Sequence, residues 1–104
     1  MIFRNLYRPT ASKRYVRFIQ QNNSAIWDNT AVAMATLPLY ADSSILLVEV
    51  AGHGIFPIVI PTDLPKGVIY DAVIYTQAGG SPANSDSVDV TYELKRGGDG
   101  GFGF

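Results

Sequence analysis

Residues 64–86, LPKGVIYDAVIYTQAGGSPANSD, decide the fold class of this chain. The segment places the turn residues 65–67 before a long alternating stretch, 68–77, and a Gly-Gly-Ser-Pro loop after it. Alternation with a period of two, bounded by Gly and Pro, predicts a β-strand between two turns. The strand's two faces are expected to be Tyr70, Ala72 and Ile74 on one side, and Asp71, Val73 and Tyr75 on the other.

The segments around this strand have the same character. Short apolar or alternating runs bounded by turn residues predict further strands at 15–20, 25–28, 31–37, 44–50, 55–60 and 87–94. The 31–37 strand is expected to be irregular and at an edge, because Pro38 closes it. Residues 21–24 are predicted to join a first hairpin, and the Gly-His-Gly turn at 52–54 a second, whose returning strand contains Pro57 and lies at an edge or a bulge.

Seven strands at short spacing, without an amphipathic helix between them, predict an all-β fold. We expect a two-sheet antiparallel β-sandwich of immunoglobulin-like or transthyretin-like topology, with a small barrel as the alternative. Tyr70, three residues after Gly67, is placed like the tyrosine corner of such sandwiches. The core is expected to contain Phe18, Trp27, Leu46, Val48, Ile58, Tyr70, Ile74 and Val90.

Length and composition predict one domain with two extended ends. The 104 residues are 47% hydrophobic, which suffices for one small core. We expect an N-terminal arm over residues 1–13, the β-sandwich over 14–95 and a flexible Gly/Phe tail over 96–104. The chain has no cysteine, so packing or association with neighbours must replace disulfides. No apolar run is long enough for a membrane span, and a soluble protein made in a cytoplasm is expected.

Charge is divided unevenly along the chain. Five bases and no acid precede residue 28, whereas residues 28–104 carry three bases and nine acids, a balance of −6. The basic segment is therefore expected to fold back on its own domain, to bind the acidic body of a neighbouring copy, to touch nucleic acid, or to remain solvated. Nucleic acid is the least favoured partner, because the body is acidic and no binding motif is present.

The two ends are the predicted partner-binding segments. Residues 1–13 contain more apolar side chains than a solvated tail usually has. At the other end, the two phenylalanines of the glycine-rich C-terminal segment are expected to insert into a partner. A solvated arm and a frayed C-terminus are the alternatives. The predicted partner-binding residues are Ile2, Phe3, Arg4, Leu6, Tyr7, Arg8, Phe102 and Phe104.

No residue pattern predicts catalysis, a cofactor or a metal. His53 is the only histidine and has no cysteine partner for a metal or a nucleophile. The aspartates at 63, 71, 86 and 89 lie near turns, where carboxylates usually bond to the local backbone. The Gly79-Gly80-Ser81 loop leads into Pro82 and a strand, and lacks the helix that a phosphate cradle requires. The chain is therefore predicted not to be an enzyme.

Residues 15–90 resemble a family of small β-sandwich proteins of bacteriophages and prophages that are associated with virions. The resemblance rests on YVRFIQ, AIWDNTA, LYADSS, SILLVEV and HGIFPIVIP, and above all on the LP-x-G entry and the AGGSPA-x-x-D loop within residues 64–86. The family often has one residue fewer between that glycine and Tyr70, and commonly ends in a Gly-rich strand, where this chain has VDVTYELKRGG.

The resemblance implies a role in a virion and supplies no catalytic residues. It implies a non-enzymatic virion structural protein, assembled in the host bacterial cytoplasm, in a multi-copy homo-oligomer or lattice with major capsid, tail or neck proteins. Capsid decoration or cementing through the termini is the preferred role. A neck, tail or baseplate adaptor is the first alternative, and a module that binds a host surface or carbohydrate is the second.

Overall fold

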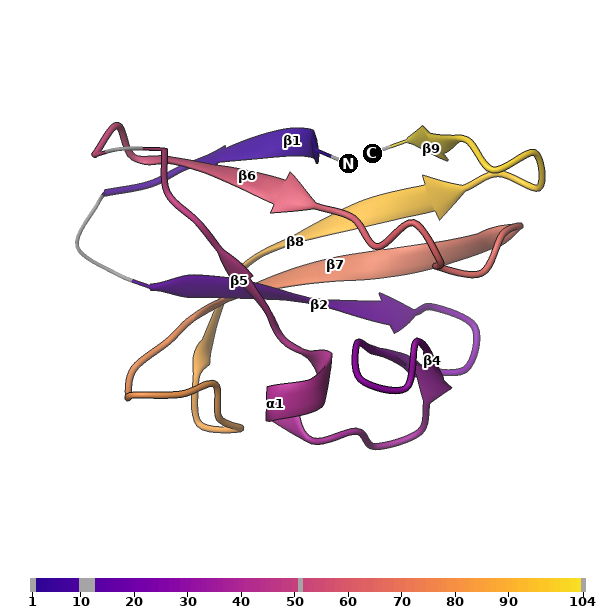
Figure 1. Cartoon of the computed structure of the whole chain (residues 1–104), viewed down its shortest axis with the longest axis horizontal. Coiled ribbons are helices and arrows are strands. Elements are labelled where there is room, and N and C mark those ends of the chain that lie inside the picture. The colour runs from indigo at the N-terminus through magenta and orange to yellow at the C-terminus, as the bar shows by residue number, and fades with distance from the viewer. Residues whose placement is uncertain (1, 10–12, 51, 104) are drawn as a thin grey trace.

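The computed structural model describes residues 2–9, 13–50 and 52–103, with only the backbone described for Ile2 and Phe3. The fold of this part is nearly all β (Figure 1). Its strands are β1 (Ile2–Tyr7), β2 (Arg14–Gln20), β3 (Ile26–Asp28), β4 (Ala33–Ala35), β5 (Ile45–Leu47), β6 (Ile55–Val59), β7 (Val68–Thr76), β8 (Ser87–Arg96) and β9 (Phe102–Gly103). One short helix, α1 (Tyr40–Ser43), lies between β4 and β5.

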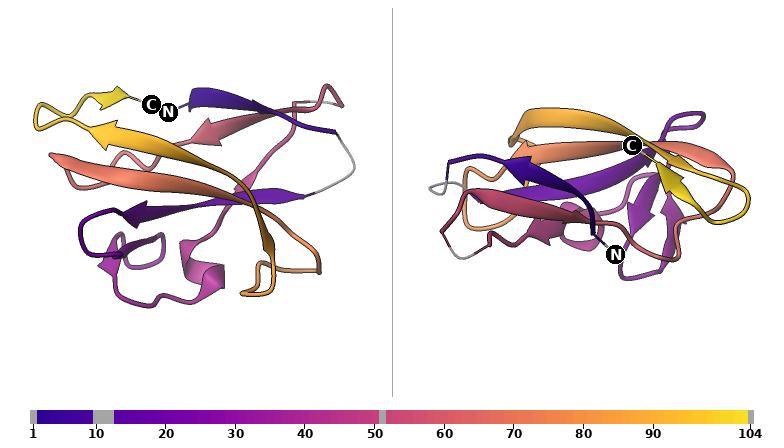
Figure 2. Two further views of the ribbon diagram at one scale, coloured as in Figure 1. Left: turned by 180° about the vertical axis from the view of Figure 1, so that it is seen from behind. Right: turned by 90° about the horizontal axis from the view of Figure 1, so that it is seen from above.

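The described strands form two antiparallel sheets, as in a β-sandwich. The larger sheet has the order β4-β3-β2-β7-β8-β9, and β5 pairs with β2 beside β3. The smaller sheet contains β1 and β6 and lies over one face of the larger sheet, as the view from above shows (Figure 2). The predicted all-β, two-sheet class is therefore confirmed.

Strand β7 lies at the centre of the larger sheet, between β2 and β8. Its two faces are those that the sequence predicts. Tyr70, Ala72 and Ile74 are fully buried in the main core, whereas Val73 and Tyr75 belong to a second, smaller cluster on the other face. Both faces of β7 are thus covered, which explains why this strand is apolar along most of its length.

The main core lies between the two sheets. The smaller sheet contributes Leu6, Phe56 and Ile58, and the larger sheet covers them with Val16, Phe18, Trp27, Leu47, Tyr70, Ala72, Ile74 and Leu94; Ile60 and Leu64 complete the cluster. Of the predicted core residues, Phe18, Trp27, Ile58, Tyr70 and Ile74 are confirmed as buried, and Val90 is half-buried against them.

Leu46 and Val48 correct the predicted core, since their exposed fractions are 54% and 72%. The predicted second hairpin is also wrong, because the strand before the 52–54 turn pairs with β2 and the strand after it pairs with β1. Strand β5 follows the edge of β2 for only three residues before the chain crosses to the smaller sheet. Of its three residues only Leu47 is buried. The first hairpin is confirmed by the pairing of β2 with β3.

Tyr70 makes the corner contact that its position predicts. Its hydroxyl donates a hydrogen bond of 2.7 Å to the carbonyl oxygen of Pro65, five residues earlier. Burial raises the pKa of Tyr70, so the hydroxyl keeps its proton and remains a donor. This contact fixes the 61–67 crossing to the start of β7, and Gly67 allows that crossing to turn with a φ of 72°.

Part of each chain end forms a strand within the domain, whereas the division into an arm at 1–13, a sandwich at 14–95 and a flexible tail at 96–104 stays a prediction. Residues 2–7 form β1, paired with β6 from Ile2↔Val59 to Tyr7↔Ile55. At the other end, β9 pairs with β8 after a turn in which the amide of Gly97 donates to the carbonyl of Gly101. Gly100, with a φ of 95°, allows this turn, so the glycines close a hairpin here.

Candidate interaction surfaces

Strand β1 presents opposite sides to the core and to solvent. Leu6 is fully buried against the body of the domain, while Arg4, Asn5 and Tyr7 are exposed. Tyr7 is 66% exposed. Of the predicted partner-binding residues, Leu6 is therefore a core residue of its own chain. Phe104 and the side chains of Ile2 and Phe3 lie outside the described residues.

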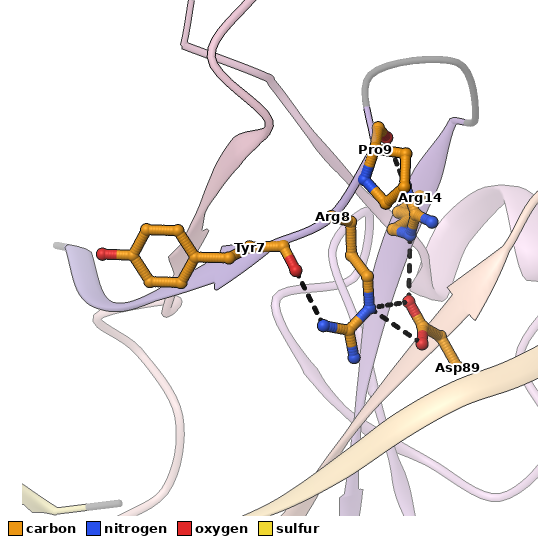
Figure 3. A network of polar contacts seen from close by, with 5 residues as sticks. All are labelled: Tyr7, Arg8, Pro9, Arg14 and Asp89. Carbon is orange, nitrogen blue, oxygen red and sulfur yellow. Dashed lines mark hydrogen bonds and ion pairs between the residues drawn. The ribbon is translucent and has the colours of Figure 1, made fainter.

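A polar cluster fastens the end of β1 to β8 (Figure 3). The Arg8 Nε donates to both carboxylate oxygens of Asp89, at 3.1 and 3.0 Å, and the Arg14 Nε donates to Asp89 Oδ2 at 2.9 Å. The two guanidinium groups also donate to backbone carbonyls, Arg8 to Tyr7 at 2.8 Å and Arg14 to Pro9 at 3.3 Å. One carboxylate thus joins both ends of the connection between β1 and β2.

A β-bulge places Asp89 in this cluster. Along β8 the register advances from Ile74↔Val90 to Tyr75↔Val88, so Asp89 is an extra residue without a direct partner on β7. A bulge of this kind redirects a side chain relative to the regular alternation. Asp89 can therefore reach the arginines of β2 and of the segment after β1.

The environment of Asp89 favours its charged form. Burial acts to raise the pKa of this carboxyl, but the hydrogen bonds and charges of Arg8 and Arg14 outweigh burial and hold the pKa below its usual value. The side chains of Arg14 and Asp89 are 8% and 16% exposed, so this ion pair is better shielded from salt than a surface pair. Of the alternatives left open by the charge pattern, fold-back on the same domain is the one observed for Arg8 and Arg14.

Arginine–aromatic contacts connect both chain ends to β8. The Arg4 guanidinium carbon lies 4.0 Å from the ring centre of Tyr92 on β8, which links β1 to that strand. On β8 itself, Arg96 lies 3.9 Å from the ring centre of Phe102 on β9. Arg96 also donates hydrogen bonds to the carbonyls of Gly100 and Thr62, at 2.7 and 3.0 Å. These contacts link β1, β8 and β9, and the side of the domain that these three strands form is called the border below.

The loop that follows β7 is closed by Asp86. Its carboxylate accepts hydrogen bonds from the amides of Ala78 and Ala83, both at 2.9 Å, and from the hydroxyl of Tyr15 at 2.7 Å. These bonds hold the pKa of Asp86 below its usual value, the bond from the Ala78 amide having the largest effect. Burial and the neighbouring Asp86 raise the pKa of Tyr15, whose hydroxyl therefore remains a donor.

Aromatic side chains support this loop from the outer face of the larger sheet. Tyr15 and Tyr75 stack with ring centres 5.0 Å apart, and Tyr40 on α1 meets Tyr75 edge-on at 6.3 Å. Arg17 lies 3.9 Å from the ring centre of Tyr40, and its Nε donates to Ser43 Oγ at 2.9 Å. Helix α1 is thereby held against the sheet. A shallow groove of about 370 Å³ lies beside the loop and is lined by Lys13, Ala41, Ser44, Leu46, Gln77, Gly80, Ser81 and Pro82.

Changing Asp86 to Asn is expected to loosen this loop and to reduce the loss of stability in acid. The folded pKa of Asp86 is lowered, so its contribution is present above the ordinary pKa of 3.8 and is lost as the pH falls through the lower, folded value. Urea unfolding of the parent and of Asp86→Asn, from pH 7 to pH 2, measures both effects. The variant should be less stable at pH 7 and should lose less stability below pH 4.

Asp63→Asn is the matched control, because it removes the same charge from an exposed side chain. This control should follow the parent throughout the pH range. If Asp86→Asn loses as much stability in acid as the parent does, the carboxylate of Asp86 does not close the loop.

The remaining residues considered for chemistry do not meet in one place. His53 is exposed in its turn, Asp63 is exposed, and Asp71 accepts a hydrogen bond from Gln21 on the outer face. Among the described residues, no group of three or more His, Asp or Glu side chains is placed to hold a metal ion. The only described helix has four residues, and no described helix is long and apolar enough to cross a membrane.

The sequence did not single out the Arg8–Arg14–Asp89 cluster or the Tyr15–Tyr75–Tyr40 stack. The available signal for the stack was the alternation of β2 and β7, which places Tyr15 and Tyr75 on the outward face of adjacent strands. The bulge at Asp89 had no such signal. Comparison of the chain with protein-family models, with curated proteins and with solved structures gives no match.

Proposed function

We propose that this chain is a non-enzymatic structural protein of a bacteriophage virion. In the preferred form of the proposal it is a head decoration or cement protein that binds the capsid lattice through residues near its two ends. We further propose that its sandwich has immunoglobulin-like or transthyretin-like topology, which the corner contact of Tyr70 with Pro65 supports. The resemblance of residues 15–90 to virion-associated β-sandwich proteins supports the biological role.

The observation that carries the proposal is the border where both chain ends pack on β8. Strands β1 and β9 lie along the same side of the molecule (Figure 1), and Arg4 and Phe102 contact β8 or its arginine. Among the described strands, β1 pairs only with β6 and lies at the edge of its sheet. An edge strand with an exposed tyrosine offers a partner both backbone hydrogen bonds and a large contact surface.

The residues proposed to attach the protein are the exposed ones on this border. Tyr7 and Arg4 are exposed, whereas Leu6 anchors the strand from inside. Arg8 and Phe102 are half-buried and fix the shape of the border through their contacts with Asp89 and Arg96. Phe104, Ile2 and Phe3 remain predictions of the sequence.

Incorporation into particles tests this attachment. Tyr7→Ala and Arg4→Ala chains are each expected to occupy particles at least about tenfold less than the parent at limiting concentration, since an interface anchor contributes about 2 kcal/mol or more. Moderate salt should weaken incorporation of the parent more than that of Arg4→Ala, because only the parent retains the exposed charge. Ile69→Ala and Lys66→Ala, at exposed positions around the start of β7, are the matched controls. Normal occupancy of both border variants would contradict the proposal.

The groove beside residues 78–86 favours a second candidate, a module that binds a host surface or a carbohydrate. Leu46 is 54% exposed and lines this groove together with Gly80, Ser81 and Pro82. Binding to host cells that Leu46→Asp abolishes, with incorporation unchanged, would favour this candidate. A neck, tail or baseplate adaptor is the remaining alternative, and its copy number per particle would be small.

A further inference from the structure

We infer that β1 is an exchangeable strand, and that two copies of this chain bind each other by placing β1 of each copy against β6 of the other. The partner of the predicted arm is then a second copy of the same chain. The inference rests on the proposed function only in assuming that exchange takes place within a particle. The exchange itself can be measured on the purified protein.

The first observation is the position of β1 in the topology. It is the first strand of the chain, and its only described strand partner is β6, in a sheet separate from the larger one. The larger sheet keeps all its pairings if β1 leaves. The chain between β1 and β2 comprises residues 8–13, and only this connection links β1 to the rest of the domain along the chain.

The second observation is that the contacts between β1 and the rest of the domain depend on particular residues. Leu6 lies opposite Phe56, in register, and is fully buried. The amide of Arg8 donates a hydrogen bond of 2.8 Å to the carbonyl of Gly54. A side chain at Gly54 would lie 2.4 Å from the carbonyl oxygen of Arg8, so this approach requires glycine. The Arg8–Asp89 ion pair completes the receiving site.

All of these partners are available in a second copy. A β1 supplied by a neighbour meets the same β6, the same Gly54 and the same Asp89 as the chain's own β1. Exchange between two copies is therefore closed and symmetric, and it retains the contacts of the monomer. The closed form is favoured at low concentration, because its β1 is tethered, and exchange is favoured where many copies are held close together.

Pro9 is compatible with the exchanged form. The residue before a proline is biased toward extended conformations, so Arg8 tends to continue the direction of β1. The proline ring also restricts φ at position 9 itself. The connection of residues 8–13 is short, and short connections between an exchangeable strand and its domain promote exchange.

Disulfide trapping between different chains tests the exchange, because the natural chain has no cysteine. Tyr7 and Ile55 are direct partners across β1 and β6, at a spacing that suits a disulfide. Full-length chains carrying Tyr7→Cys alone and Ile55→Cys alone are unfolded and refolded together at about 1 mM, near the effective concentration of a short tether, and then oxidised under mild conditions. Mass spectrometry measures the 7–55 linked pair.

Asp71→Cys and Glu93→Cys chains are the matched control, because these residues are also direct partners, but on β7 and β8 in the larger sheet. The 7–55 pair is expected to form at least about tenfold more than the 71–93 pair, and to decrease when refolding is done at low concentration. A second pair, Asn5→Cys with Pro57→Cys, repeats the measurement at another position of the same register.

Yields of the 7–55 and 5–57 pairs no higher than that of the 71–93 control would overturn the inference. Size-exclusion chromatography of the unmodified chain gives an independent reading, since exchange predicts a dimer fraction that grows with refolding concentration. A result that shows no exchange does not contradict the proposal that this chain is a virion protein. Exchange by a protein that never enters particles would contradict the virion proposal alone.

Discussion

Replacing Trp27 with alanine is expected to lower the free energy of unfolding by about 3–5 kcal/mol, as for large aromatic residues in other cores. Trp27 is 3% exposed on β3, where it packs in the main core and lies opposite Met34 on β4. A cavity there removes the contacts that hold the β3–β4 hairpin to the rest of the sheet. For a domain whose total stability is about 5–15 kcal/mol, this loss is a large fraction.

Leu46→Ala is the control for this prediction, because Leu46 is also apolar and lies in a strand of the same sheet but is 54% exposed. Its effect on unfolding should stay near 0.5 kcal/mol, the usual size for exposed positions. Equilibrium unfolding in urea, followed by tryptophan fluorescence for Leu46→Ala and by circular dichroism for Trp27→Ala, measures both. A loss below about 1 kcal/mol for Trp27→Ala would mean that Trp27 is not a core residue.

Replacing Leu6 with alanine is expected to cost about 2–5 kcal/mol, the range for a buried leucine. Leu6 is fully buried on the face of the smaller sheet that packs against the larger sheet, and among the β1 side chains that the structure describes, those of residues 4–7, it alone is buried. Loss of its side chain should weaken the attachment of β1 as a whole. Hydrogen exchange should therefore show faster exchange along both β1 and β6 in the Leu6→Ala variant.

Tyr7→Ala is the matched control, on the next residue of the same strand and on its exposed side. It should change the free energy of unfolding by no more than about 0.5 kcal/mol while impairing incorporation into particles. The pair thus separates the role of β1 in the fold from its role at the surface. Equal, small effects of Leu6→Ala and Tyr7→Ala on stability would show that β1 is a detachable arm.

The sequence predicts the centre of the fold better than its margins. Strand β7 and its two faces follow from local alternation and from turn residues on either side, and Tyr70 follows from its spacing to Gly67. These signals lie within a few residues of one another. The first hairpin is predicted for the same reason, because β2 and β3 are joined by a short polar turn.

The margins depend on pairings between distant parts of the chain. Nothing within residues 2–7 specifies β6 as the partner of β1, since the partner lies about fifty residues away. The apolar run around β5 suggested a core strand, yet Leu46 lies on the exposed face of β5, and Val48 is exposed because the chain leaves the sheet after Leu47. An apolar run specifies a strand, but not how many of its residues the fold covers.

The candidate surfaces were predicted only in part. The sequence indicated that the carboxylate of Asp86 would bond to its own loop, and two local amides are among its three partners. The third partner, Tyr15, comes from a strand 71 positions away. Asp89 required both the bulge in β8 and the fold-back of β1 before Arg8 and Arg14 could reach it. Neither feature has a local signature.

An inventory of purified particles tests the central proposal most directly. Particles released from the cells that encode this chain would be purified, and quantitative mass spectrometry would count each protein relative to the major capsid protein. A head decoration protein is expected in hundreds of copies per particle, whereas a handful would place it at the neck or baseplate. Absence of the chain from purified particles, while it accumulates in the same cells, would contradict a role in the virion.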